Sequence, residues 1–212
     1  MKLKFIFAAS LFALASQVQA APVNLVVNGS FEDTPSTVAP GTFETFSNIT
    51  GWTTGGNANG IEIRNNRVGT AAAGDNFAEL DSTGNTNIFQ TLSTTAGQAY
   101  TLSFAYSPRL DQPSDTNGIS ALWNGSIISV PAIITGNGAG NVDNVWTTYV
   151  FSVIGTGSDI LGFSAAGISD TFGGGIDSVS VSAVPIPAAA FLFAPALLGF
   201  MGLRRKTKNL AA

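Results

Sequence analysis

The chain has 212 residues, a formal net charge of −4, and neither cysteine nor histidine. Without cysteine there is no disulfide framework, thiolate metal site or cysteine nucleophile, and without histidine the commonest general base and transition-metal ligand are missing. Only 10% of the residues are charged, against about 25% in an ordinary globular domain. The composition therefore excludes most familiar catalytic arrangements.

The few charges are unevenly placed along the chain. Six of the nine lysines and arginines lie at the two ends, and only Arg64, Arg67 and Arg109 lie between them. All 13 acidic residues fall between Glu32 and Asp177, so the central segment carries a net charge of −10. Because such a segment offers no basic patch to phosphates, we expect no nucleic-acid partner.

The N-terminus has the three parts of a secretory signal peptide. Lys2 and Lys4 precede an apolar run over residues 5–15, and small residues follow up to Ala20. This arrangement predicts a signal peptide over residues 1–20 that is cleaved after Ala20, with the secretion translocon and signal peptidase as partners. A buried N-terminal helix is the alternative.

The C-terminus predicts a single membrane-spanning helix. Residues 188–203 are uncharged and follow a proline motif, and a basic cluster comes directly after them. As a helix they would span about 24 Å, a marginal length against a hydrocarbon core of about 30 Å. The basic cluster favours a cytoplasmic tail to residue 212 and a body outside the cytoplasm. The motif consists of Val184, Pro185, Ile186 and Pro187, and the cluster of Arg204, Arg205 and Lys206.

Together these elements, over residues 184–206, resemble the PEP-CTERM sorting signal of Gram-negative bacteria. The third motif position, most often glutamate in that family, is Ile186 here, so the match is to a variant form. The resemblance implies that an exosortase-type membrane protease cuts near the prolines, which interrupt any helix and keep the motif accessible. The body would then pass from the inner membrane to the cell surface or the extracellular space. A plain tail anchor is the alternative.

The body reads as short β-strands separated by turn residues, without long helical periodicity. In the run from Tyr100 to Tyr106, large apolar side chains alternate with small or polar ones, which places them on opposite faces of a strand. The Asn124-Gly125 pair predicts a tight hairpin. The other predicted strands cover residues 24–27, 61–64, 77–81, 87–93, 119–123, 126–130, 146–154, 160–165 and 176–182. About ten such strands predict an all-β, two-sheet sandwich.

A second resemblance covers residues 24–182. The carrying fragments are NLVVNGSFE from Asn24, the pair Gly51-Trp52, AELDS from Ala78, QAYTLSF from Gln98 and GIDSVSV from Gly175. In this order they resemble jelly-roll, galactose-binding-like domains of secreted carbohydrate-binding modules. The resemblance implies a jelly-roll β-sandwich over residues 21–183.

Glu32 and Asp177 are candidate metal ligands. Jelly rolls of this kind place the first and last strands side by side, which would bring the two carboxylates together. Two carboxylates repel unless a proton or a metal intervenes, and oxygen ligands without histidine or cysteine favour Ca²⁺. The resemblance likewise implies a structural calcium at these positions. In the alternative, Glu32 caps backbone amides and Asp177 begins a strand.

Trp123 and Arg109 are candidate sugar-binding residues. Trp52 and Trp146 are expected to pack in the core or at a corner, whereas Trp123, beside the predicted hairpin turn, is the tryptophan expected to be exposed for stacking on a sugar. Arg109 lies on a polar loop and could hold a sugar hydroxyl or carboxylate. Its alternative is a surface ion pair with one of the nearby aspartates, Asp111 or Asp115.

These features predict a non-enzymatic, exported surface or extracellular-matrix protein that is sorted through its C-terminus and binds polysaccharide through its jelly-roll body. A purely structural matrix component without a ligand is the alternative. Because the segment from 21 to 183 lacks histidine, cysteine and lysine, the enzymatic alternative left is a glycosidase that uses paired carboxylates.

Overall fold

A computed structural model describes residues 23–55 and 60–185 of the chain. The predicted signal peptide and cleavage site, Ile186, Pro187, the predicted membrane segment and its basic cluster lie outside these residues. Val184 and Pro185 lie within them and follow the last strand without regular structure. In the described part of the chain no helix has the length and apolar character needed to cross a membrane.

The described residues form twelve strands. In chain order they are β1 (Phe43–Phe46), β2 (Asn48–Ile49), β3 (Trp52–Thr54), β4 (Ile61–Asn65), β5 (Asn76–Glu79), β6 (Asn87–Ser93), β7 (Ala99–Ser107), β8 (Ile119–Trp123), β9 (Ser126–Ile127), β10 (Thr147–Ile154), β11 (Ser158–Ala165) and β12 (Gly175–Ala183).

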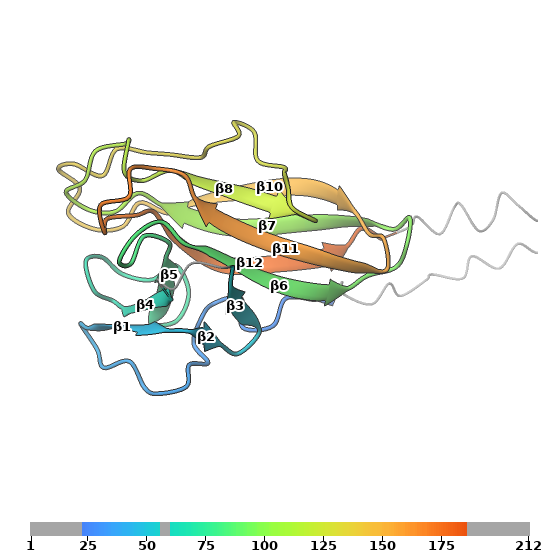
Figure 1. Cartoon of the computed structure of the whole chain (residues 1–212), viewed down its shortest axis with the longest axis horizontal. Coiled ribbons are helices and arrows are strands. Elements are labelled where there is room, and N and C mark those ends of the chain that lie inside the picture. Colours follow the sequence, from blue (N-terminus) through green and yellow to red (C-terminus); the bar gives the residue numbers. More distant parts are fainter. Residues whose placement is uncertain (1–22, 56–59, 186–212) are drawn as a thin grey trace, which may run out of the picture. The chain divides into compact units, whose positions relative to one another are not determined.

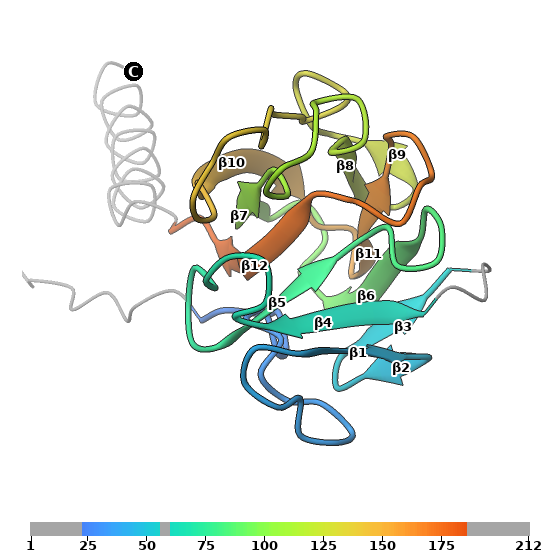
Figure 2. The same cartoon turned by 90° about the vertical axis from the view of Figure 1, so that its left-hand side faces the viewer.

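These strands make two antiparallel sheets of six strands each, as the all-β expectation requires (Figure 1). The first sheet has the order β1-β4-β5-β12-β7-β10, and the second has the order β2-β3-β6-β11-β8-β9. Within them, β5-β12-β7-β10 and β6-β11-β8-β9 have the strand order of an eight-stranded jelly roll. Strands β1 and β4 extend the first sheet beside β5 (Figure 2).

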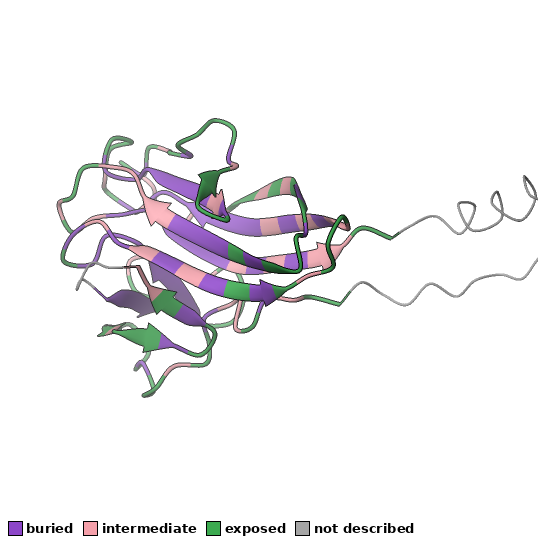
Figure 3. Ribbon diagram, turned by 45° about the vertical axis from the view of Figure 1, so that its right-hand side comes forward, coloured by how far each residue is buried: buried purple, intermediate pink, exposed green. Residues whose placement is uncertain are grey.

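The core lies between the two sheets and follows the predicted alternation. In β7, Tyr100, Leu102, Phe104 and Tyr106 are all buried in it, and the register pairs Leu102 with Val181 of β12. The positions between them face the opposite side of the sheet. Exposed residues gather on the loops and on the outermost strands (Figure 3).

The predicted first strand, residues 24–27, is wrong as an element. Only Asn24 forms a β-bridge, to Ser182 of β12. Its side-chain oxygen accepts hydrogen bonds from the backbone N–H groups of Val26 and Val181, at 3.0 and 2.9 Å. These side-chain hydrogen bonds stand in place of part of the backbone hydrogen bonds that a paired strand would form. The segment still runs along the last strand, as expected, because Leu25 donates its N–H to Val181.

Candidate ligand-binding cleft

A row of charged side chains lies on the outer face of the first sheet. In β4 the side chains of Ile61 and Ile63 enter the core, so strand alternation turns Glu62 and Arg64 to the other face. Glu62 stands opposite Glu79 of β5 in the antiparallel register. Two strands that are separate in the sequence therefore place two carboxylates and one guanidinium side by side.

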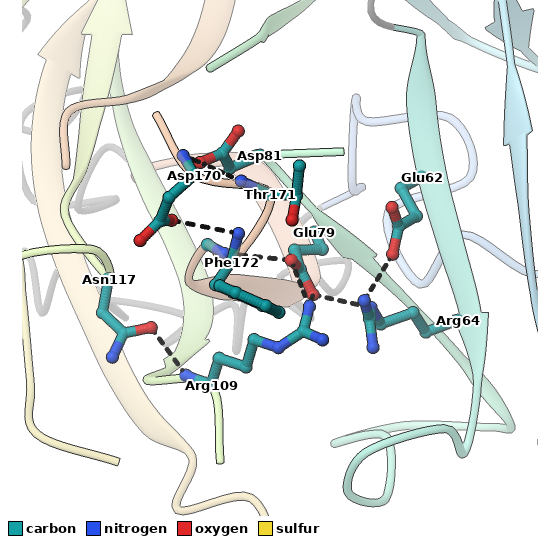
Figure 4. A network of polar contacts seen from close by, with 10 residues as sticks. Glu62, Arg64, Glu79, Asp81, Arg109, Asn117, Asp170, Thr171 and Phe172 are labelled. Carbon is teal, nitrogen blue, oxygen red and sulfur yellow. Dashed lines mark hydrogen bonds and ion pairs between the residues drawn. The ribbon is translucent and has the colours of Figure 1, made fainter. Parts of the chain in front are cut away.

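These groups form a buried ion-pair network with Arg109 (Figure 4). Arg64 lies between two carboxylates, with 2.6 Å from its Nη2 to Glu62 Oε1 and 2.6 Å from its Nε to Glu79 Oε2. Arg109 Nη1 donates to both oxygens of Glu79, at 2.6 and 2.7 Å. The backbone N–H of Gly173 also donates to Glu79 Oε1, at 2.9 Å. The arginine side chains are thereby held in fixed positions.

Arg109 reaches this network from the loop after β7. Its backbone N–H donates to the side-chain oxygen of Asn117 at 2.9 Å, and Asn117 is fully buried. The guanidinium lies 4.7 Å from the centre of the Phe172 ring, within the range of a cation–π contact. The alternative interpretation of Arg109, an ion pair with Asp111 or Asp115, is wrong, because its carboxylate partner is Glu79.

The loop that carries Phe172 is held in place by hydrogen bonds to Asp81. The Asp81 carboxylate accepts the backbone N–H groups of Asp170 and Thr171, at 2.9 and 3.2 Å. Gly173 passes so close to Asp81 that a Cβ there would stand 2.8 Å from the Asp81 Cβ. Glycine is therefore required for the loop to return to β12.

A cavity of about 410 Å³, which we call the arginine cleft, adjoins the ion-pair network. It is lined by Arg64, Arg67 and Arg109 together with Phe43 and Phe172. These arginines are the only cations of the described residues. One aliphatic side chain and several hydroxyl and acidic groups complete the lining: Val68, Thr45, Glu62, Ser82, Thr83 and Thr171.

Burial shifts the pKa values of the two glutamates. Burial raises the pKa of Glu79 to about 7, although the guanidinium groups of Arg64 and Arg109 lower it. Burial likewise raises the pKa of Glu62. The charge of the network therefore changes close to neutral pH.

We expect the protein to lose stability as the pH rises from about 5.5 to about 8. An unfolded chain has released the Glu79 proton above pH 4.5, whereas the folded state holds it until about pH 7. The folded state thus binds more protons, and the stabilisation is lost as the pH rises through the folded pKa, on the order of 2 kcal/mol for this group. Asp177, whose pKa burial raises to about 6, acts in the same direction.

Urea unfolding of the wild type and of Glu79→Gln at pH 5.5, 6.5 and 8 measures this dependence. The free energy of unfolding of the variant should fall less steeply with pH than that of the wild type, since the amide side chain does not titrate. A wild-type free energy of unfolding that rises over this range would contradict the assignment.

Glu32 and Asp177 meet at one loop, the connection between β4 and β5. Asp177 Oδ2 accepts the N–H groups of Ala72 and Ala73, at 2.8 and 2.9 Å. Glu32 Oε1 accepts those of Asp75 and Asn76, both at 2.9 Å. Asp177 lies inside β12 and does not begin it.

These contacts bear on a metal in two ways. Neither carboxylate has an arginine partner among the ion pairs of the described residues, and the nearby Glu32 charge adds to burial in raising the pKa of Asp177. Two oxygen donors without a counter-charge fit the chemistry of Ca²⁺. Within residues 23–55 and 60–185, however, no three acidic side chains converge as a metal cluster. Calcium stays a prediction.

Trp123 is not an exposed stacking platform. Its side chain is 7% exposed, belongs to the core and donates its indole N–H to the carbonyl of Ile154 at 3.2 Å. The prediction of exposure is wrong because β8 alternates, and Trp123 shares the core face with Ile119 and Ala121. Trp52 is fully buried, as expected. Trp146 is half-buried and packs edge-on against Phe77.

The fold is that of a jelly-roll β-sandwich, and comparisons with known proteins give the family. A family model described as "Protein of unknown function (DUF642)" matches residues 24–182. The chain belongs to the DUF642 family. No curated protein matches the chain.

Solved structures share the fold at low sequence identity. The Stig cyclase FisC from Fischerella sp. TAU aligns with a TM-score of 0.51 and 15% identity over 78% of this chain and 99% of that one. An arabinose-bound α-L-arabinofuranosidase, MgGH51, aligns with a TM-score of 0.53 and 12% identity over 77% of this chain and 27% of that one. The module TmCBM61, solved with β-1,4-galactotriose, aligns with a TM-score of 0.46 and 18% identity over 75% of this chain and 97% of that one. The first two likenesses show the fold alone.

Proposed function

We propose that this protein is an exported surface or matrix protein whose jelly-roll body binds a polysaccharide segment in the arginine cleft. The observation that carries the proposal is the convergence of Arg64, Arg67 and Arg109, drawn from a β-strand and two loops, on one cavity. Its volume of about 410 Å³ lies in the range of about 300–1,000 Å³ that is usual for small-molecule sites.

The chemistry of the cleft suits a sugar ring. Guanidinium groups donate several hydrogen bonds in a fixed plane, which matches neighbouring hydroxyls. Phe43 and Phe172 offer apolar rings on which the C–H faces of a sugar can pack. Because ion pairs and aromatic contacts already hold the arginines, binding costs little side-chain entropy.

The same geometry favours binding over glycoside hydrolysis. Glu62 and Glu79 do stand opposite each other, as a carboxylate pair would need to. Glu79, however, does not line the cleft, and its carboxylate is paired with Arg64 and Arg109, which do. A general acid must reach the glycosidic oxygen, and Glu79 has no such access.

A glycan array probed with the full-length protein tests the proposal. We expect retention of at least one polysaccharide, and an affinity about tenfold lower for Phe43→Ala, whose ring is 46% exposed and carries no core packing. Val150→Ala, an exposed position on β10 at the other edge of the same sheet, is the matched control. Absence of binding to every glycan would favour the purely structural alternative instead.

Export and sorting complete the proposal and rest on the terminal sequences. Mass spectrometry of the protein from its native cells should give an N-terminus at Ala21 and a C-terminus close to Pro185. An intact C-terminal segment in the mature protein would contradict exosortase-type processing and favour a plain tail anchor instead.

Calcium at Glu32 and Asp177 is a further part of the proposal. Thermal unfolding of the full-length protein with Ca²⁺ and with chelator is the test, and we expect a higher Tm with Ca²⁺. Asp177→Asn should remove most of that difference, since the amide lacks the charge. Identical curves for the wild type would remove calcium from the account.

A further inference from the structure

The charge of the arginine cleft is opposite in sign to that of the body around it. The body carries three cations and 13 acidic residues, yet all three cations line this one cavity and Glu62 is the single acidic residue that lines it with them. Serine, threonine and asparagine, which are plentiful in this chain, would supply hydrogen bonds to a neutral sugar. Concentrating every available arginine there points to a negatively charged ligand.

The three arginines are not equivalent. Arg64 and Arg109 are committed to the carboxylates of Glu62 and Glu79. Arg67 is exposed and, within the described residues, has no carboxylate partner. Its one hydrogen bond goes to the carbonyl of Gly41, at 3.3 Å from Nη1. The rest of its five-donor fork faces no described protein acceptor.

Arg67 is held in place despite its exposure. Its guanidinium lies 5.9 Å from the centre of the Phe43 ring, which packs against Arg64 as well, at 5.4 Å. The turn that carries it is pinned by Asn66, whose side chain donates to Asp75 at 3.1 Å and accepts the N–H of Ala71 at 2.9 Å. A positioned, unpaired guanidinium at the edge of a cleft is suited to a carboxylate, which it can bind in a bidentate manner.

We propose that the cleft selects acidic polysaccharides, and that Arg67 binds the carboxylate of a uronic acid unit while Phe43 and Phe172 flank the sugar. This inference rests on the proposed function and names the substrate class of the same site. A sulfate ester also carries a negative charge, and a guanidinium binds tetrahedral oxyanions in a bidentate manner as well. The oxygens of a sulfate ester are, however, weaker hydrogen-bond acceptors than those of the more basic carboxylate.

Matched polymers test the role of the charge. Isothermal titration of the full-length protein would compare polygalacturonate with its fully methyl-esterified form, which keeps the backbone and loses the charge. Cellouronate oligomers and cello-oligomers of equal length form a second pair that differs only at C6, and dextran sulfate tests any polyanion. We expect binding to one of the acidic polymers to be at least tenfold tighter than to its neutral counterpart and to dextran sulfate, and to weaken with added salt.

Variants assign the effect to Arg67. Arg67→Gln should lower the affinity for the acidic polymer about tenfold and the affinity for its neutral counterpart by a clearly smaller factor, because the amide keeps hydrogen-bond donors for hydroxyls but has no charge for a carboxylate. Arg67→Lys keeps the charge and should retain part of the affinity for the acidic polymer. Glu44→Gln, an exposed charge change on the neighbouring strand β1, is the control for general electrostatics. Tm values equal to that of the wild type would show that all three variants fold.

The remaining outcomes separate this inference from the proposed function. Equal affinity for the acidic and neutral members of each pair would overturn the inference and leave polysaccharide binding in place. Equal or tighter binding of dextran sulfate would show a general polyanion site. No binding to any of these polymers would overturn the inference, and the glycan array would then decide the proposed function by itself.

Discussion

Replacing Glu79 with alanine is expected to lower the free energy of unfolding by about 3–5 kcal/mol at pH 7.5. The Glu79 carboxylate forms ion pairs with Arg64 and Arg109, and it accepts hydrogen bonds from Arg109 and from the backbone N–H of Gly173. Its removal takes a shared oxygen partner away from two largely buried guanidinium groups, and buried polar groups left without a partner cost more than the lost interaction contributes. Urea denaturation monitored by tryptophan fluorescence measures the loss.

A double variant separates the unpaired charge from other causes. Glu79→Met combined with Arg109→Met replaces one pair by apolar groups of similar volume and keeps the pair of Arg64 with Glu62. Because such replacements are often neutral, the double variant should regain most of the lost stability. If it is as unstable as Glu79→Ala, the packing of Glu79 and not its charge is responsible. Glu44→Ala, on an exposed side chain, should change stability by less than about 0.5 kcal/mol.

Trp52→Ala is expected to cost about 3–5 kcal/mol of stability through loss of core packing. The side chain is fully buried, with ring centres 5.5 Å from Phe31 and 6.1 Å from Phe163. Its indole N–H also donates to the carbonyl of Asn28 at 3.0 Å, which ties the N-terminal segment to the core. Differential scanning calorimetry and urea unfolding would measure the change.

Two variants calibrate the Trp52 result. Trp52→Phe keeps an aromatic ring against Phe31 and gives up the hydrogen bond, so its cost should be clearly smaller. Trp146→Ala removes a half-buried ring on the outer face of the sheet and should likewise cost less. Equal losses at Trp52 and Trp146 would contradict the placement of Trp52 at the centre of the core.

The core strands can be predicted from the sequence because the patterns that specify them lie within a few consecutive residues. The alternation from Tyr100 to Tyr106 gives β7 and its inward face directly, and the Asn124-Gly125 pair gives the β8–β9 hairpin. Both turn residues have the positive φ angles, 52° and 78°, that this turn requires. Strand β1 was missed because it lies exposed at a sheet edge, where no core face imposes an alternating pattern.

The arginine cleft was not predictable because it depends on register. Arg64 and Glu79 meet only when β4 and β5 pair in one alignment, and Arg109 arrives from a loop that Asn117 shapes. One sequence signal was available: in residues 61–64, isoleucines alternate with Glu62 and Arg64. In a body with three arginines, a charge at such a position marks the outer face of the sheet as a place to search.

Hydrogen–deuterium exchange of the full-length protein, with and without the glycan that the array selects, tests most directly whether the arginine cleft is the binding site. Protection should concentrate in three of the segments that line the cleft, residues 41–45, 66–71 and 170–173, and should disappear in Phe43→Ala at the same glycan concentration. Protection of the opposite sheet, at residues 119–134, with no change in these three segments would contradict the account.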